Sequence, residues 1–140
     1  MDKTVELLRR HEGVKPHAYK CSAGYVTIGV GRNIDQNGGL GLSDDEIDYL
    51  LQNDIKRCQQ ELTTYFVWFE KLNEVRKNAM INLVFNLGLS RLRKFEKALF
   101  AMSEQDWETA SKELLDSRWA EQVGQRAVEI AEMVRTGEYI

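Results

Sequence analysis

The sequence is poor in proline and cysteine and has no long apolar run. Its 140 residues include one proline and two cysteines, so neither a proline-rich linker nor a disulfide framework organises the chain. No window approaches the roughly 18 consecutive apolar residues of a membrane-spanning helix. The first residues also lack the apolar segment of a secretory signal. We therefore expect synthesis in the cytosol, no stable membrane insertion, and free thiols at Cys21 and Cys58.

A strong charge of one sign is also missing. The sequence has 19 Lys and Arg residues against 22 Asp and Glu, which gives a formal net charge of −3. This balance does not point to nucleic acid as a partner, and it predicts weak long-range attraction to anionic polymers. With 43% hydrophobic residues, a chain of this length can bury a hydrophobic core and fold as one domain.

The patterning predicts two kinds of structure along the chain. Residues 1–12 suit a short amphipathic helix that ends at Gly13, with Pro16 preventing its continuation. From Ala18 to about Gly41 the sequence is rich in glycine and strand-forming residues, which predicts a small hairpin-like sheet. The rest of the chain has helical periodicity. The predicted fold class is α+β, with a small β-containing lobe and a larger helical lobe.

Several local signals mark where the later helices begin and end. Ser43 and Glu46 form a capping-box pattern that starts a long helix. Residues Val75–Leu87 are apolar on nearly every side, which indicates a helix surrounded by others, and Gly88 ends it. Ser103 is expected to begin a further capped helix.

Two familiar motifs fail when their spacing is checked. His11 and Glu12 begin like a zinc-protease motif, but Lys15 stands where the second histidine belongs. Gly29 and Gly31 begin like a dinucleotide-binding loop, but the third glycine is missing. No standard zinc-ligand spacing is present either. We therefore expect neither a metal ion nor an organic cofactor.

Glu12 remains as a candidate for acid–base chemistry. It lies where the first helix is predicted to end, facing the glycine-rich hairpin that contains Thr27. The C-terminus of a helix carries partial negative charge, which favours the protonated carboxyl group that a general acid requires. Position alone leaves open the alternative that Glu12 is an ordinary surface carboxylate.

A resemblance to a known family covers nearly the whole chain. The residues that carry it are Leu7–Gly13, Ala18–Gly31, Asn78–Gly88, Ser117–Trp119, Gln125–Ala127 and Arg135–Gly137. On these residues the sequence resembles the phage-type lysozymes of glycoside hydrolase family 24, which include endolysins. The resemblance implies a two-lobed fold with a cleft between the lobes. Residues 1–140 would form one catalytic domain. Within it, residues 13–60 would form the small lobe and the connecting helix. Residues 61–140, together with the helix 1–12, would form the helical lobe.

The resemblance also implies a reaction and its residues. The family hydrolyses the β-1,4 bond between N-acetylmuramic acid and N-acetylglucosamine in peptidoglycan, using a signature of Glu, Asp and Thr. Glu12 and Thr27 match the outer positions, and Cys21 occupies the middle one. Glu12 would protonate the leaving glycosidic oxygen, and Thr27 would help hold the attacking water. Arg126 matches a position whose cation pairs with the glutamate, which would favour the ionised carboxylate.

Further positions are expected to contact the substrate. Phe85 and Asn86 correspond to the floor of the cleft, although residues in a core helix also have a packing role. Gly31 follows the predicted strand and is included with them as a substrate-binding residue. Arg32 is expected to form a structural ion pair with an acidic neighbour, and Asp35 to stabilise a turn rather than act as the acid.

Cys21 is the departure that matters most. A thiol can replace a carboxylate only when it is ionised, and an unperturbed cysteine is about 3% ionised at pH 7. Three functions stay open: a lysozyme assisted by a thiolate, a lytic transglycosylase that depends mainly on Glu12, and an inactive relative that binds peptidoglycan. We expect the first, in a monomeric endolysin of a phage or prophage. It would wait in the host cytoplasm until a holin or similar lesion lets it reach the cell wall.

Overall fold

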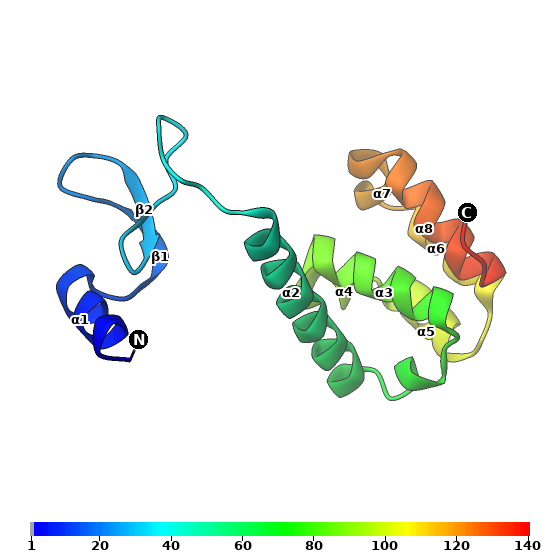
Figure 1. Cartoon of the computed structure of the whole chain (residues 1–140). Helices are drawn as coiled ribbons and strands as arrows, with labels where there is room; N and C mark the ends of the chain where they lie inside the picture. Colours follow the sequence, from blue (N-terminus) through cyan, green and yellow to red (C-terminus); the bar gives the residue numbers. More distant parts are fainter. Residues whose placement is uncertain (1) are drawn as a thin grey trace. The chain divides into compact units, whose positions relative to one another are not determined.

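The computed structural model describes residues 2–140, which form two compact units (Figure 1). Unit 1 extends to Leu50 and unit 2 comprises Leu51–Ile140. Unit 1 contains a helix, a three-stranded sheet and the start of a long helix. These elements are α1 (Asp2–Glu12), β1 (Lys15–Lys20), β2 (Val26–Gly29), β3 (Arg32–Asn33) and the first part of α2 (Asp44–Tyr65). The expected α+β class and the sheet on the N-terminal side are confirmed.

Helix α1 ends where the sequence predicts. Gly13 has φ +81°, a conformation that glycine adopts without steric cost, and its N–H donates to the Arg9 carbonyl at 2.9 Å. Glu12 is therefore the last residue of the helix, as expected.

The sheet is antiparallel with strand order β1-β2-β3, so β2 is central. Thr27 lies opposite Tyr19 on β1 and Asn33 on β3. The register of β1 shifts between Lys15 and Tyr19. After β3 the chain turns around Asp35, whose carboxylate accepts bonds from the backbone N–H groups of Val26 and Asn37, both at 2.9 Å. Asp35 is thus a turn residue.

The predicted capping box at the start of α2 is confirmed. The Ser43 hydroxyl accepts a bond from the Glu46 N–H at 3.2 Å, and the Glu46 carboxylate accepts one from the Ser43 N–H at 2.9 Å. Two backbone donors that the first turn leaves unpaired are satisfied in this way.

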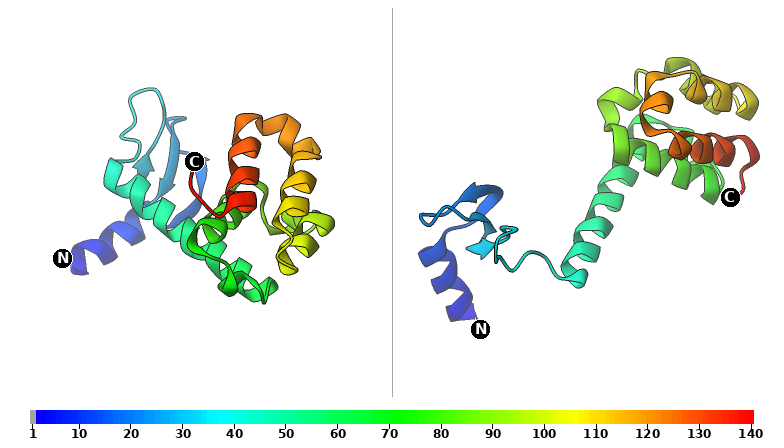
Figure 2. Two further views of the ribbon diagram at one scale, coloured as in Figure 1. Left: turned by 90° about the vertical axis from the view of Figure 1, so that its right-hand side faces the viewer. Right: turned by 90° about the horizontal axis from the view of Figure 1, so that it is seen from above.

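Unit 2 is a helical body. After the rest of α2 it contains η1 (Phe69–Lys71), α3 (Glu74–Leu87), α4 (Leu89–Leu92), α5 (Glu96–Ser103), α6 (Trp107–Leu115), α7 (Arg118–Val123) and α8 (Gln125–Thr136). Helix α6 packs against α5 and α8, and α8 packs against α3 (Figure 2). The largest fully buried side chains of the core are Leu62, Met80, Leu83, Leu92, Met102, Leu114, Ile130 and Val134.

One helix start was predicted wrongly. Ser103 is the last residue of α5, and its hydroxyl donates to the Phe100 carbonyl at 2.5 Å. Helix α6 is instead capped by Asp106, which accepts a bond from the Thr109 N–H at 3.2 Å. Both Ser and Asp are good capping residues, so local sequence does not separate them. Gln105, with φ +60°, makes the reversal between the two helices.

Two smaller expectations are confirmed as well. Gly88 ends α3 by donating its N–H to the Val84 carbonyl at 2.8 Å. Cys21 and Cys58 are free thiols, and Cys58 is buried in the core.

Within residues 2–140, every helix is too short or too polar to cross a bilayer.

Candidate active site

The Glu12 carboxyl group lies against the backbone of Gly31. A Cβ atom added to Gly31 would stand 2.8 Å from Glu12 Oε2 and 3.0 Å from Cδ, so the Glu12 side chain would have to shift to accommodate it. Gly31 also has φ +66°, in the left-handed region that favours glycine. The absence of a side chain at Gly31 therefore makes the space that Glu12 occupies. Glu12 is exposed, but it is seated against the turn that follows β2.

Cys21 and Thr27 are neighbours at the other end of the β1–β2 pair. The Cys21 N–H donates to the Tyr25 carbonyl at 2.9 Å, and the Gly24 N–H donates to the Cys21 carbonyl at 2.8 Å, which closes a tight turn. Thr27 is only 4% exposed, so it is one of the few buried polar residues of the chain. Its hydroxyl donates to the Tyr25 carbonyl at 2.9 Å, which leaves the oxygen lone pairs free to accept a bond.

The turn favours the thiolate form of Cys21. Backbone N–H groups of Tyr25 and then Ala23 are the main causes that lower the pKa of this thiol, and burial works weakly against them. The Thr27 hydroxyl and the Gly24 N–H add smaller effects in the same direction. Because the hydroxyl proton of Thr27 is engaged with Tyr25, it must rotate away before it can stabilise the sulfur. The fraction of Cys21 that is ionised near neutral pH therefore exceeds that of an ordinary cysteine.

Arg32 braces the loop after the sheet, as predicted. Its guanidinium donates two bonds to Glu46, at 2.8 and 2.7 Å, and a third to the Gly41 carbonyl at 2.9 Å. The hydrogen bonds from Arg32 are the largest cause that lowers the pKa of Glu46 to about 2. Arg32 is committed to this ion pair, so it is a structural residue.

The predicted site residues of unit 2 lie on α3 and α8. Arg126 donates from Nε and Nη2 to the Asn82 side-chain oxygen, at 2.9 and 2.7 Å. The Asn86 side-chain oxygen accepts a bond from the Trp119 indole at 2.7 Å. Phe85 is 47% exposed, although α3 also contributes four buried side chains to the core. A helix end with an exposed aromatic ring and two oriented amides is suited to sugar contacts.

The structure thus brings the predicted residues together in two groups. Glu12 contacts Gly31 and Cys21 neighbours Thr27 within unit 1, and β2 joins the two pairs. Phe85, Asn86 and Arg126 belong to unit 2. The pairing of Arg126 with Glu12 stays a prediction.

Sequence reasoning missed two side-chain partners of these residues. Asn82 holds Arg126, and Trp119 holds Asn86. A signal for Asn82 was present, because Asn82 and Asn86 are four residues apart and therefore share one face of α3. The backbone N–H groups around Cys21 had no signal of this kind, since their direction depends on the turn that residues 21–24 adopt.

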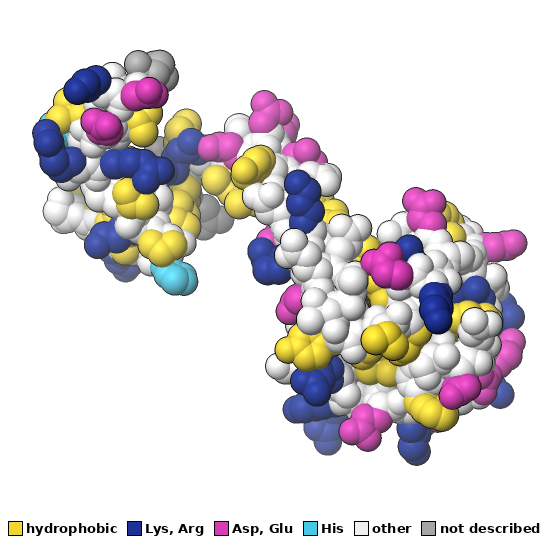
Figure 3. Space-filling view, turned by 90° about the horizontal axis from the view of Figure 1, so that it is seen from below, with side chains coloured by type: hydrophobic (Ala, Val, Ile, Leu, Met, Phe, Trp, Pro, Cys, Tyr) yellow, Lys and Arg dark blue, Asp and Glu magenta, His cyan; other side chains and the backbone are white. Residues whose placement is uncertain are grey.

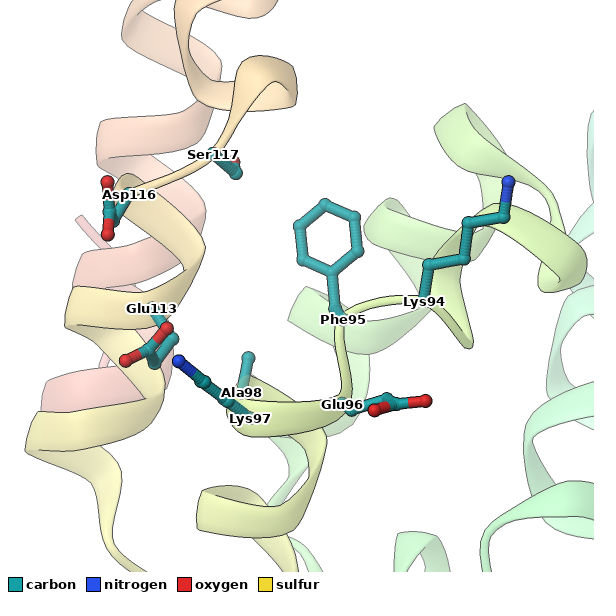
Figure 4. Close-up of a pocket in the computed structure, with 8 residues that line it drawn as sticks. All are labelled: Lys94, Phe95, Glu96, Lys97, Ala98, Glu113, Asp116 and Ser117. Atoms are coloured by element: carbon teal, nitrogen blue, oxygen red, sulfur yellow. The ribbon is translucent and has the colours of Figure 1, made fainter.

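A separate cavity of about 330 Å³ opens in unit 2 (Figure 4). Its lining combines Phe95 and Ala98 with two lysines, three carboxylates and Ser117. Figure 4 shows the Lys97 ammonium pointing toward the Glu113 carboxylate across this cavity. Both signs of charge therefore meet in this lining. None of its residues had been predicted from the sequence.

Comparison with known proteins identifies the family. The model of the phage lysozyme family matches residues 9–135, which include every predicted site residue. The chain belongs to the phage lysozyme family. It is therefore a lysozyme-type enzyme that degrades peptidoglycan.

Similar proteins come from both cells and phages. The chain is 26% identical to probable T4-type lysozyme 1 of Dictyostelium discoideum, over 94% of this chain and 93% of that protein. It is 30% identical to the pre-baseplate central spike protein Gp5 of Enterobacteria phage T4, over 95% of this chain but only 28% of that protein. It is 34% identical to a SAR-endolysin of Haemophilus phage HP1, over 66% of this chain and 50% of that protein.

Proposed function

We propose that this phage lysozyme is a muramidase, which hydrolyses the β-1,4 bond between N-acetylmuramic acid and N-acetylglucosamine. The observation that carries the proposal is the seat of Glu12 against Gly31, on the same small sheet that holds Cys21 and Thr27. Glycoside hydrolysis needs an acid, a negative charge and a group that positions water. The Glu12 carboxyl group, the Cys21 thiol with its lowered pKa and the Thr27 hydroxyl would supply these in turn.

The roles follow from the chemistry of each group. Glu12 donates its proton to the glycosidic oxygen as the bond to the muramic carbon breaks. The Cys21 thiolate would face the positive charge that develops on the sugar ring, and the backbone N–H groups around it favour this ionised form by lowering the pKa of the thiol. Thr27, whose own proton is engaged with Tyr25, accepts a bond from the attacking water and orients it. The water completes the hydrolysis and leaves a reducing muramic acid.

Phe85, Asn86 and Arg126 would bind the glycan strand from unit 2. Asn86 and Arg126 are held by Trp119 and Asn82, so they present fixed groups with little loss of side-chain entropy on binding. The exposed ring of Phe85 offers an apolar face for a sugar.

Mass spectrometry of the muropeptides released from bacterial sacculi tests the reaction type. Hydrolysis gives products that end in a reducing muramic acid, and the Glu12→Gln protein is the matched control. Products that end in a 1,6-anhydro ring would instead assign a lytic transglycosylase, in which the muramic C6 hydroxyl replaces the water. Binding to sacculi without any product would assign an inactive binding module.

The biological role we propose is host lysis by a monomeric endolysin. The endolysin names of several relatives support it, and a holin or similar lesion would admit the protein from the cytoplasm to the wall. Lysis by the chain expressed with and without a holin tests this route. Lysis without a holin would overturn it and assign another route of export.

A further inference from the structure

The charges of unit 1 are segregated, although the whole chain is nearly balanced. Residues 1–32 contain six Lys and Arg residues and three Asp and Glu residues. Residues 33–50 contain five Asp and Glu residues and neither Lys nor Arg. Figure 3 shows dark blue side chains gathered over unit 1, and magenta ones over the start of α2. The total charge of −3 conceals a basic region on α1 and β1.

Two cations of this region, Arg9 and Lys15, lie three residues before and three residues after Glu12 in the sequence. Arg9 precedes Glu12 by three positions on α1, so the two side chains are neighbours on one helix face. Lys15 places its ammonium group 6.0 Å from the centre of the Tyr19 ring, and Tyr19 lies directly opposite Thr27 in the sheet. Side chains of directly opposed residues share a face of the sheet. The Lys15 side chain therefore lies on the same face of the sheet as Tyr19 and Thr27.

These cations have no carboxylate partner among residues 2–140. Arg32, Arg57 and Arg135 each form an ion pair within the chain, whereas Arg9 and Lys15 lie more than 4.0 Å from any described carboxylate oxygen. Both side chains are exposed. Their charges are free to attract an anionic ligand that binds beside Glu12.

We infer that Arg9 and Lys15 bind carboxylates of the peptides attached to the muramic acid, so that the enzyme prefers peptidoglycan whose peptide carboxylates are free rather than amidated. This inference rests on the proposed muramidase function. The carboxylates of these peptides are the anionic groups that the substrate itself brings to the neighbourhood of the cleaved bond. A phosphate polymer of the envelope, by contrast, is not part of the disaccharide and peptide unit that is cleaved.

Binding to purified sacculi, measured by co-sedimentation, tests the inference. All variants carry Glu12→Gln, so that cleavage does not change the sacculi. The test protein adds Arg9→Gln and Lys15→Gln. The control adds Lys71→Gln and Lys112→Gln, which remove two exposed, unpaired cations from unit 2. Each set of sacculi is used untreated, after carbodiimide amidation of its carboxylates, and after chemical removal of phosphate polymers.

We expect the test protein to bind untreated sacculi roughly threefold to tenfold more weakly than its parent, a loss in the range of two exposed ion pairs. The loss should shrink as salt is added. Amidation should weaken the parent and the control to the same extent and leave the test protein unchanged. Equal binding of all three proteins to untreated sacculi would overturn the inference. So would a loss that follows removal of phosphate polymers and not amidation.

The muropeptide assay keeps this inference separate from the proposed function. If the wild-type chain releases no muropeptides, the muramidase function fails. If it releases them and amidation does not alter binding, the carboxylate inference alone fails.

Discussion

The Glu12 carboxyl group lies against the backbone of Gly31, with Oε2 2.8 Å from the position that a Cβ atom of residue 31 would occupy. The contact joins the end of α1 to the turn after β2, two segments with no hydrogen-bonded ladder between them. It places the proposed acid beside the small sheet that carries Thr27 and that ends next to Cys21.

Gly31→Ala should therefore reduce lytic activity strongly, by roughly tenfold or more, since small displacements of a general acid are costly. The strain of an L-residue at positive φ adds about 1–2 kcal/mol of destabilisation. Gly29→Ala is the matched control, because Gly29 has nearly the same φ of +67° but nothing within 4 Å of its added Cβ. Both variants should lose similar stability in thermal unfolding, and only Gly31→Ala should lose most activity. Equal activity losses would contradict the role of this contact.

The lowered pKa of Cys21 predicts an unusual alkylation profile. The rate of iodoacetamide reaction follows the thiolate, so for Cys21 it should rise at a lower pH than for a model thiol. Cys58 is an internal comparison, because burial raises the pKa of its thiol. Mass spectrometry of peptides gives each rate against pH. A Cys21 profile that coincides with the model thiol would contradict stabilisation by the turn.

Cys21→Asp and Cys21→Ala test what the thiolate does. A carboxylate ionises at lower pH than a thiol, so Cys21→Asp should keep or raise activity and extend it toward acid. Cys21→Ala removes the negative charge and should lower activity by roughly tenfold or more. Lytic rates on sacculi across a pH series provide the measurement. An alanine variant as active as wild type would show that the second group is dispensable.

The Arg32–Glu46 ion pair predicts how stability depends on pH. The pKa of Glu46 is lowered in the folded chain to about 2, so the pair stabilises the fold above the ordinary carboxyl range. That contribution to stability should be lost as the pH falls from the ordinary carboxyl range through the pKa that Glu46 has in the folded chain. Glu46→Gln should therefore lower the melting temperature at pH 7 and leave it unchanged near pH 2. A difference that is the same at both pH values would rule out this electrostatic origin.

Much of unit 1 was predictable because its signals are local. Gly13 ends α1 through its own positive φ, and Ser43 and Glu46 are partners within one turn of helix. The place of Glu12 at a helix end followed from these signals. Its contact with Gly31 did not, because the two residues meet only after the sheet has formed.

The helical unit shows where local signals are insufficient. Ser103 and Asp106 both suit a helix start, and the choice between them depends on the reversal at Gln105 and on the packing of α6 against α5 and α8. Arg126 could be matched to a family position, but its bond to Asn82 spans 44 residues. Such a pairing depends on how α3 and α8 pack, which local sequence does not encode.

The correction at α6 has its own test. Asp106→Ala should lower the melting temperature, because the Thr109 N–H loses its acceptor at the helix start. Ser103→Ala should have little effect, since the Ser103 hydroxyl caps no helix N-terminus. The comparison needs only thermal unfolding followed by circular dichroism. A larger loss for Ser103→Ala would contradict the capping by Asp106.

Release of soluble fragments from purified sacculi by the wild-type and Glu12→Gln proteins, at equal folded concentration, tests the central claim most directly. The account predicts release by the wild type and none by Glu12→Gln, while both proteins still bind the sacculi. Release by Glu12→Gln at the wild-type rate would contradict the assignment of Glu12 as the acid.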